Sequence, residues 1–173
     1  MDTESVNKYL KNKLDELKKK SSELQDDIKS LEIEKKEVFK QIEKYKEKID
    51  GVTVTGGDPF MQVDALGELL LGIEALGIED TLVYTGYTLD EIKSDSRMDR
   101  VLTHIGVLVD GPYIDALNDN KSIRGSSNQH ILVLRKSLTN RYHDVDNWNR
   151  KSQTIYTNSS LYSIGIPHKE DLK

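Results

Sequence analysis

The first fifty residues carry apolar side chains at alternating spacings of four and three, the repeat of a helix that packs against another helix. This period of 3.5 residues predicts a left-handed coiled coil, because a straight helix could not keep so narrow a stripe against a partner. The two heptad positions of the seam, d and a, are occupied respectively by Leu10, Leu17, Leu24, Leu31, Val38 and Tyr45, and by Leu14, Ser21, Ile28, Lys35, Ile42 and Ile49.

Two polar residues interrupt this seam. Ser21 and Lys35 stand at a positions, where polar residues weaken the contact but favour one register and a dimer. We therefore expect residues 1–50 to form a coiled-coil helix that makes a homodimer through residues 10–49. The alternative is a helix that packs along its own domain.

Beyond Asp50 the pattern changes to short apolar runs that are separated by turns. Runs with the composition of strands alternate with runs of helical spacing, and Gly77 is a helix stop. In chain order they are a strand at 52–54, a helix at 64–76, a strand at 81–84, a helix at 89–93 and a strand at 105–109. This alternation predicts right-handed βαβ units, a parallel sheet and an α/β fold class.

The last forty residues differ again. Residues 154–157 alternate between polar and apolar, and a second apolar stretch follows at 161–167. These patterns predict one strand and a covering segment, or two strands. We therefore divide the chain into the coiled-coil helix, an α/β domain at 51–134 and a C-terminal extension at 135–173.

Glycine-rich turns follow the three predicted parallel strands, at residues 55–59, 84–87 and 110–113. In a parallel sheet the carboxyl ends of the strands lie along one edge, where ligands bind. Glycine permits positive φ and a close approach of the backbone, so main-chain amides can reach a ligand, and Asp58 can hold a positive charge. The alternative is that each glycine merely makes its turn.

Composition removes several classes of function. The net charge is −5 and arises beyond residue 50, so a nucleic-acid surface is not predicted. The sequence contains no cysteine, which excludes disulfides, cysteine nucleophiles and thiolate metal sites. No apolar run approaches the roughly 18 residues of a membrane span. We expect a soluble, cytoplasmic protein.

Four segments, taken in order, resemble the anaerobic ribonucleoside-triphosphate reductase activating proteins of the radical S-adenosylmethionine superfamily. They are GVTVTGGDPF at 51–60, DTLVYTGYTLDE at 80–91, VLVDGPYI at 107–114 and RGSSNQ at 124–129. The first segment is shared across the superfamily, whereas the last two at this spacing are specific. The resemblance covers residues 46–134.

The resemblance implies a partial α/β barrel that positions S-adenosylmethionine beside a [4Fe–4S] cluster held by the cysteines of a CxxxCxxC motif. It also implies an anaerobic ribonucleotide reductase as partner. By position it assigns to S-adenosylmethionine, or to the reductase interface, the residues Thr55, Gly56, Gly57, Asp58, Tyr84, Thr85, Gly86, Asp110, Gly111, Arg124, Gly125, Ser126, Asn128 and Gln129.

The sequence departs from this family at the cluster. The family's first strand and cysteine loop precede the position of Gly51, and here a predicted coiled coil stands in their place. Without thiolates we expect no [4Fe–4S] cluster on this chain and no cleavage of S-adenosylmethionine. The four histidines have no metal-like spacing, so we predict no metal ligand and no catalytic residue. Loss of the first strand also predicts an exposed edge on the strand at 52–54.

Three functions remain open. The first is a degenerate relative of the activase that binds the reductase or S-adenosylmethionine without catalysis and acts as a regulator or adaptor. The second is a genuine activase whose cluster half is missing here or supplied by another chain. The third is a repurposed interaction or inhibitor module that keeps the glycine turns only for folding.

Overall fold

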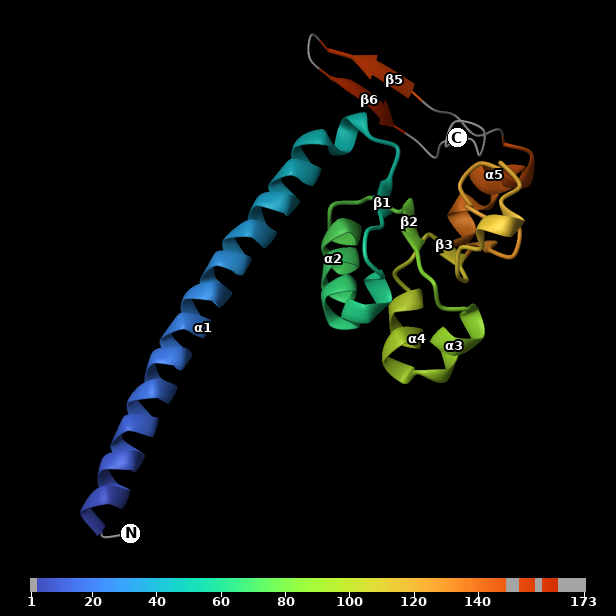
Figure 1. Cartoon of the computed structure of the whole chain (residues 1–173). Helices are drawn as coiled ribbons and strands as arrows, with labels where there is room; N and C mark the ends of the chain where they lie inside the picture. Colours follow the sequence, from blue (N-terminus) through green and yellow to red (C-terminus); the bar gives the residue numbers. More distant parts are fainter. Residues whose placement is uncertain (1–2, 149–152, 158–159, 165–173) are drawn as a thin grey trace. The chain divides into compact units, whose positions relative to one another are not determined.

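The computed structural model describes residues 3–148, 153–157 and 160–164, and the chain divides into two compact units, 1–47 and 48–173. The first unit is one helix, α1 (Thr3–Tyr45), followed by a turn of 3₁₀ helix, η1 (Lys46–Lys48) (Figure 1). The predicted long helix is therefore confirmed. Ion pairs one turn apart, such as Lys13 with Glu16 and Lys19 with Glu23, support it by about 0.3 kcal/mol each.

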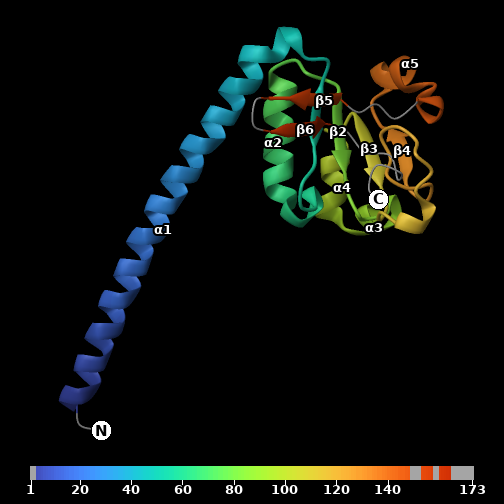
Figure 2. The same ribbon diagram turned by 45° about the horizontal axis from the view of Figure 1, so that its top comes forward.

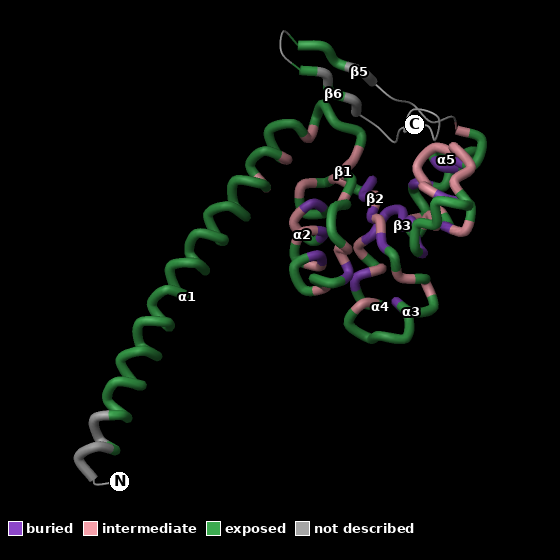
Figure 3. The backbone as a smooth tube through the Cα atoms, viewed as in Figure 1, coloured by how far each residue is buried: buried purple, intermediate pink, exposed green. Residues whose placement is uncertain are grey.

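The helix exposes its heptad seam in this structure. Leucines at both seam positions are about half exposed, and α1 is coloured as exposed along almost all of its described length (Figure 3). The coiled coil and the homodimer stay predictions.

The second unit contains a four-stranded sheet of order β1-β2-β3-β4, in which the strands lie side by side (Figure 2). The strands are β1 (Val52–Val54), β2 (Thr81–Tyr84), β3 (Val107–Asp110) and β4 (His130–Val133). Helices α2 (Val63–Ala75), α3 (Leu89–Ser94) and α4 (Ser96–Leu102) connect the first three strands. The fold is mixed α/β.

The expected parallel order holds for β1, β2 and β3, which pair in parallel in sequence order. A fourth strand, β4, was not predicted, and it pairs antiparallel with β3, with Asp110 opposite His130, so the sheet is mixed. Strand β4 returns after a loop rather than a helix, so no crossover forces it to be parallel. Strand β1 is an edge strand of the sheet, and no other described strand pairs with its free side.

The segment after β4 contains short helical turns and a hairpin. The turns are η4 (Lys136–Leu138), α5 (Thr139–Tyr142) and η5 (Val145–Asn147). The hairpin joins β5 (Gln153–Tyr156) to β6 (Leu161–Ile164) as an antiparallel pair. The second apolar stretch of the tail is thus a strand as far as Ile164, and its remainder lies outside the described residues.

Both faces of the sheet are covered, because neighbouring residues of β3 point to opposite sides. Leu108 packs with residues of α2, α3 and α4, including Leu70 and Ile92. Val107 packs instead with Leu138, Tyr142 and Val145 of the segment after β4. Three residues of β3, Val107 to Val109, have no exposed surface, which explains their unbroken apolar run. Among the described helices, none has the length and apolar content that a membrane crossing requires.

A buried polar group joins α5 to the start of β2. Asp80 is 7% exposed, and its Oδ1 accepts a hydrogen bond of 2.9 Å from the Tyr142 hydroxyl. The Arg141 Nε lies 2.9 Å from Asp80 Oδ2. Burial, and then the hydrogen bond to Asp80, raise the pKa of Tyr142 to about 12. The folded state therefore favours the neutral phenol.

We expect Tyr142→Phe to lower the free energy of unfolding by about 1–2 kcal/mol at pH 7, because Asp80 loses a donor. Since the folded pKa lies above the ordinary value of about 10, the wild type keeps this contribution below pH 10 and loses it as the pH rises towards 12. Urea unfolding across this range measures the difference, which should shrink with pH. Tyr87→Phe, whose hydroxyl contacts only the Met61 sulfur, is the control. A constant difference would contradict this assignment.

Two glycines differ in the space that their surroundings leave for a Cβ atom. A Cβ on Gly106 would lie 2.7 Å from the Glu79 carbonyl oxygen and 2.9 Å from the Thr81 amide nitrogen. A Cβ on Gly67, within α2, would make only an ordinary 3.6 Å contact with Val101. Glycine is therefore required at position 106 by the close approach of two backbones.

We expect Gly106→Ala to destabilise the protein by about 1–3 kcal/mol, because β3 must shift away from the residues before β2. Gly67→Ala should instead be neutral or stabilise by up to about 1 kcal/mol, since alanine favours the helix. Thermal unfolding of the two variants measures the contrast. Equal melting temperatures would show that the backbone yields at Gly106.

Candidate functional site

Three turns meet at the carboxyl ends of β1, β2 and β3, as the sequence predicted for a parallel sheet. The turn after β2 is held to β3 by hydrogen bonds from the Thr85 amide to the Val109 carbonyl (3.0 Å) and from the Gly111 amide to the Tyr87 carbonyl (2.8 Å). The turn after β1 is joined to it through the side chain of Asp58.

Asp58 connects the first two turns through both oxygens of its carboxylate. Oδ1 accepts hydrogen bonds from the Thr85 hydroxyl (2.9 Å) and the Phe60 amide (3.0 Å), and Oδ2 accepts one from the Gly86 amide (2.8 Å). The same carboxylate caps the 3₁₀ turn η2 (Pro59–Gln62). Asp58 therefore acts as an internal brace between the two turns. Its carboxylate oxygens accept hydrogen bonds from protein groups and do not await a cation.

The first turn has the left-handed backbone that requires glycine. Gly56 has φ of 87° and Gly57 has φ of 50°, and a Cβ on either would meet nothing within 4 Å. No group in the described part of the chain accepts a hydrogen bond from their backbone amides. These two amides are thus available as donors to a ligand. At the third turn Gly111, with φ of 89°, reverses the chain after β3.

Asp110, at the end of β3, is 2% exposed and organises the elements around the third turn. Its Oδ2 accepts a hydrogen bond from the amide of Leu89, the first residue of α3, at 2.8 Å. Its Oδ1 accepts one from the His130 amide at 3.2 Å and lies 2.8 Å from His130 Nδ1. Asp110 is therefore a positioning residue behind the turns.

Gln129 and Ser126 hold the loop before β4 against the third turn. The Gln129 side chain accepts hydrogen bonds from the amides of Gly125 (2.9 Å) and Ser126 (3.1 Å) and donates one to the Gly111 carbonyl (2.8 Å). The Ser126 hydroxyl, which has no exposed surface, accepts one from the Ile114 amide. These bonds explain why small and amide residues recur in this segment.

An open hollow with a volume of about 240 Å³ lies between these turns. Its lining consists of Gly57, Asp58, Tyr84, Thr85, Gly86, Gly111, Tyr113 and Gln129. The sequence prediction therefore brings seven site residues together. It omitted Tyr113, although this residue ends the DGPY turn and its ring, half exposed, packs on Gly125. The sequence feature that could have identified Tyr113 as a site residue is its position as an aromatic residue just after a predicted strand.

Tyr84, at the end of β2, is one of the residues that line this hollow. Its hydroxyl donates a hydrogen bond of 2.6 Å to the carbonyl of Ile123, and burial raises the pKa of Tyr84. Ile123 has φ of 69°, which is unusual for a β-branched residue. The phenol thus holds a strained loop residue in place.

The remaining predicted residues lie around the hollow rather than in it. Thr55 and Gly56 line a separate depression of about 170 Å³ beside α2. The Arg124 guanidinium pairs with Asp119 (2.8 Å) and Asp146 (3.3 Å) and does not line the hollow. Asn128 donates to the Pro112 carbonyl, while its buried Oδ1 has no partner among the described residues.

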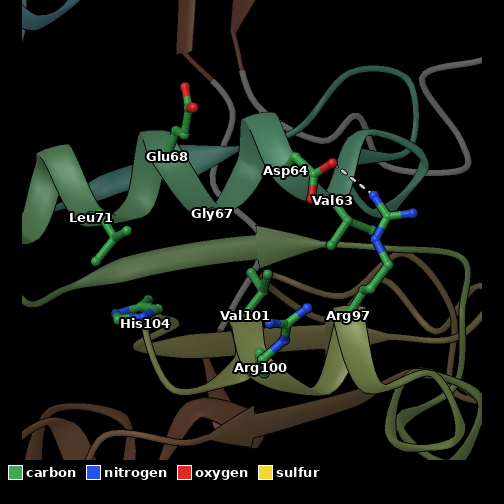
Figure 4. A pocket seen from close by; sticks show the side chains of 9 residues that line it. All are labelled: Val63, Asp64, Gly67, Glu68, Leu71, Arg97, Arg100, Val101 and His104. Carbon is green, nitrogen blue, oxygen red and sulfur yellow. Dashed lines mark hydrogen bonds and ion pairs between the residues drawn. The ribbon is translucent and has the colours of Figure 1, made fainter.

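A larger groove, of about 360 Å³, lies between α2 and α4 (Figure 4). Two ion pairs lie along it: Arg97 contacts Asp64 at 2.7 Å, and His104 contacts Glu74 at 2.9 Å. The hydrogen bond with His104, followed by that with Arg135, lowers the pKa of Glu74. The Arg100 Nε donates to the Ser96 carbonyl, and the described residues of the groove contain no cluster of three metal-ligating side chains.

The donor set does not fit an iron–sulfur cluster. The sequence has no cysteine, and the described residues contain no cluster of three histidine, aspartate or glutamate side chains that could hold a metal. His104, His130 and His143 each contact a different protein group, and His168 lies outside the described residues. No step of a reaction can be derived through such a cluster on these residues.

The family model described as a 4Fe-4S single cluster domain matches residues 15–132, and the chain belongs to this family. The match includes most of α1 as well as the sheet. The family is named for a 4Fe-4S cluster, whereas this sequence contains no cysteine that could ligate one.

Two curated relatives carry the name anaerobic ribonucleoside-triphosphate reductase-activating protein. The one from Pasteurella multocida (strain Pm70) is 39% identical over 89 residues, which are 49% of this chain and 56% of the relative. The one from Enterobacteria phage T4 is 34% identical over 86 residues, which are 48% of this chain and 53% of the relative. The predicted resemblance is confirmed. The chain spans about half the length of these relatives, and no solved structure matches it.

We expect Asp58→Ala to lower the free energy of unfolding by about 2–3 kcal/mol, because it removes a cap and leaves the buried Thr85 hydroxyl without its acceptor. Asp58→Asn should cost less, since the amide oxygen can still accept from Thr85 while its NH₂ opposes the Gly86 amide. Urea unfolding and hydrogen exchange of the Gly86 amide measure the two effects.

The matched control for these variants is Asp90→Asn, an exposed aspartate in the first turn of α3. It should change neither quantity. If Gly86 keeps its protection from exchange in Asp58→Ala, the carboxylate does not brace the two turns.

Proposed function

We propose that this chain is a degenerate relative of the anaerobic ribonucleotide reductase activases that binds without catalysing. It keeps part of the family's α/β scaffold, a remnant of the partial barrel, and acts as a regulatory or adaptor protein. Its strand-end loops bind a small ligand or the reductase, and α1 pairs the protein into a homodimer. The observation that carries the proposal is the coexistence of the family's turns with a sequence that has no thiolate.

The absence of thiolates argues against catalysis on this chain. The family's cluster needs cysteine ligands, and when bound it would supply the electron that cleaves S-adenosylmethionine. Neither the histidines nor the carboxylates of the described residues converge to replace them. What this chain can do with its own residues is bind and orient.

The preserved turns favour the amino-acid end of S-adenosylmethionine as ligand. The amides of Gly56 and Gly57 have no acceptor within the described chain and can donate to a carboxylate. The hollow of about 240 Å³ is smaller than a site for a drug-sized ligand, at least about 300 Å³, so it suits one end of such a molecule. Tyr113 offers an exposed aromatic ring beside it.

The proposed protein partner is an anaerobic ribonucleotide reductase, on which the named relatives act. A second candidate function is an activase in which another chain, or a segment beyond this sequence, supplies the cluster. It is favoured by the match to only about half of each relative's length. The third reading, an interaction module without a ligand, predicts an inert hollow.

We expect calorimetric titration to show that S-adenosylmethionine binds the wild type, and that Gly57→Val weakens this binding at least tenfold by filling the hollow and straining the turn. The matched control is Gly77→Val. Gly77 also has a positive φ, of 82°, and open space around its Cβ position, but it ends α2 away from the hollow. It should cost similar stability and leave the affinity unchanged.

Three outcomes would contradict parts of this proposal. If the wild type gives no heat with S-adenosylmethionine, the hollow does not serve this ligand and the interaction module is favoured. If anaerobic reconstitution with iron and sulfide yields a brown protein that forms deoxyadenosine, the non-catalytic function is wrong. If a purified anaerobic reductase is not retained by the tagged full chain, the proposed partner is wrong.

A further inference from the structure

Helix α1 exposes an apolar seam that needs a partner. The seam leucines and isoleucine between residues 14 and 31 are each more than half exposed, at 51% for Leu14, 56% for Ile28 and 63% for Leu31. They recur at heptad positions of a helix whose remaining residues are mainly charged or polar. A stripe of this kind is covered by a second helix when a coiled coil forms.

The charges beside this seam are segregated along the helix. At the flanking positions e and g, every residue from Lys11 to Lys20 is lysine, and every residue from 25 to 34 is acidic except Gln25. The lysines are Lys11, Lys13, Lys18 and Lys20, and the acidic residues are Asp27, Glu32 and Glu34. Pairs between flanking positions decide the orientation of two helices, so this segregation distinguishes parallel from antiparallel pairing.

A parallel pair in register brings like charges together. There, a g residue faces the e residue five positions later on the second copy, so Lys13 faces Lys18 and Asp27 faces Glu32. Each contact occurs twice by symmetry. The Lys35 side chains would also meet at one a layer. No flanking pair of opposite charge compensates in this arrangement.

An antiparallel pair reverses this outcome. When Leu14 packs against Leu31 of the second copy, Leu17 packs against Ile28 and Ser21 against Leu24. In this register every fully charged flanking pair is attractive. The pairs are Lys13 with Glu34, Lys20 with Asp27, and Lys11 with Glu32, each formed twice.

Shifting the antiparallel register by one heptad introduces repulsive pairs. In one direction Lys20 faces Lys20 of the second copy and Lys18 faces Lys18, and only Lys13 with Asp27 stays attractive. In the other direction Asp27 faces Asp27, although Lys18 with Glu32 and Lys20 with Glu34 stay attractive. The charges therefore select one register as well as one orientation. In the structure Lys13 pairs with Glu16 of its own helix, and because both side chains are exposed this pair is readily exchanged.

We propose that α1 forms an antiparallel coiled coil with α1 of a second copy, with Leu14 opposite Leu31. This inference rests on the homodimer of the proposed function and assigns its orientation and register. Because each chain continues from the carboxyl end of α1 into residues 48–173, those units leave the coiled coil at opposite ends. A helix of this length spans about 60 Å, which is the distance between the two carboxyl ends of α1 in the antiparallel pair.

Charge reversal at one flanking position tests the orientation, because the two arrangements predict opposite signs. In the antiparallel register Lys13→Glu replaces two attractive pairs by two repulsive ones, and we expect the dimer Kd to rise about tenfold. In a parallel pair it would relieve the contact with Lys18 and lower the Kd. Sedimentation equilibrium of the full chain measures this change.

The matched control is Lys19→Glu, on the outer face of α1. Lys19 loses an intrahelical pair with Glu23, just as Lys13 loses one with Glu16, but it lies away from the seam. It should change the Kd less than about twofold. A lower Kd for Lys13→Glu, or equal effects of the two variants, would overturn the proposed orientation.

The absence of native cysteine permits a second, direct test. When differently tagged Leu14→Cys and Leu31→Cys chains are mixed and oxidised, the antiparallel register predicts a disulfide between the two variants and none between two Leu14→Cys chains. Self-linking of Leu14→Cys would establish a parallel pair and overturn the inference while leaving the homodimer intact. A monomeric wild type in sedimentation would instead overturn the homodimer itself.

Discussion

The carboxylate of Asp58 is the constraint on which the strand-end site depends. It lies at the end of β1, yet its oxygens accept hydrogen bonds from Thr85 and Gly86 after β2. The turn after β2 is in turn hydrogen-bonded to β3 and to Gly111. One side chain thereby joins the first turn to the other two. Without it, the left-handed glycines of the first turn would have no fixed position relative to the hollow.

In this arrangement the buried side chains support the loops, and the backbone amides of the first turn stay available to a ligand. Asp110, Ser126 and Gln129 are buried, and their polar groups are hydrogen-bonded to the backbone of neighbouring loops. The amides of Gly56 and Gly57 face no acceptor in the described chain. The left-handed backbone that glycine adopts readily is thus placed where its amides can meet a ligand, and the satisfied polar groups behind it hold the neighbouring loops. A binding function needs only this, whereas the family's redox chemistry also needs thiolates that the sequence lacks.

The two units of the chain use charge in different ways. In α1 the charges lie beside an apolar seam and bear on which helix can pair with it and in which direction. In the described part of residues 48–173 several charged groups form local pairs, such as Arg124 with Asp119. Burial opposes the ionisation of Asp119, but the hydrogen bonds from Arg124 and Lys121 still lower its pKa. The proposed adaptor would therefore recruit its second copy through the helix and its ligand through backbone amides.

By itself the sequence determined the features that depend on local periodicity and on residue type. The heptad repeat predicted the long helix, the short apolar runs located β1 and β2 at their observed bounds, and the glycine turns located the edge where the hollow lies. The lack of cysteine excluded a thiolate-held cluster before any coordinate was known.

Only the tertiary structure decided what each site residue contacts. The sequence suggested that Asp58 binds a ligand. In the structure its carboxylate instead accepts hydrogen bonds from Thr85 and Gly86, which are 27 and 28 positions away along the chain. Arg124, predicted to lie near S-adenosylmethionine or at the reductase interface, pairs with Asp119 and does not line the hollow, whereas Tyr113 lines the hollow without being predicted. The antiparallel direction of β4 could not be predicted from the sequence either. The direction of a strand depends on how the preceding loop returns to the sheet and not on the residue pattern of the strand. The local sequence determines which backbone conformations are low in free energy. Long-range hydrogen bonds and packing determine which polar groups remain free to bind a ligand.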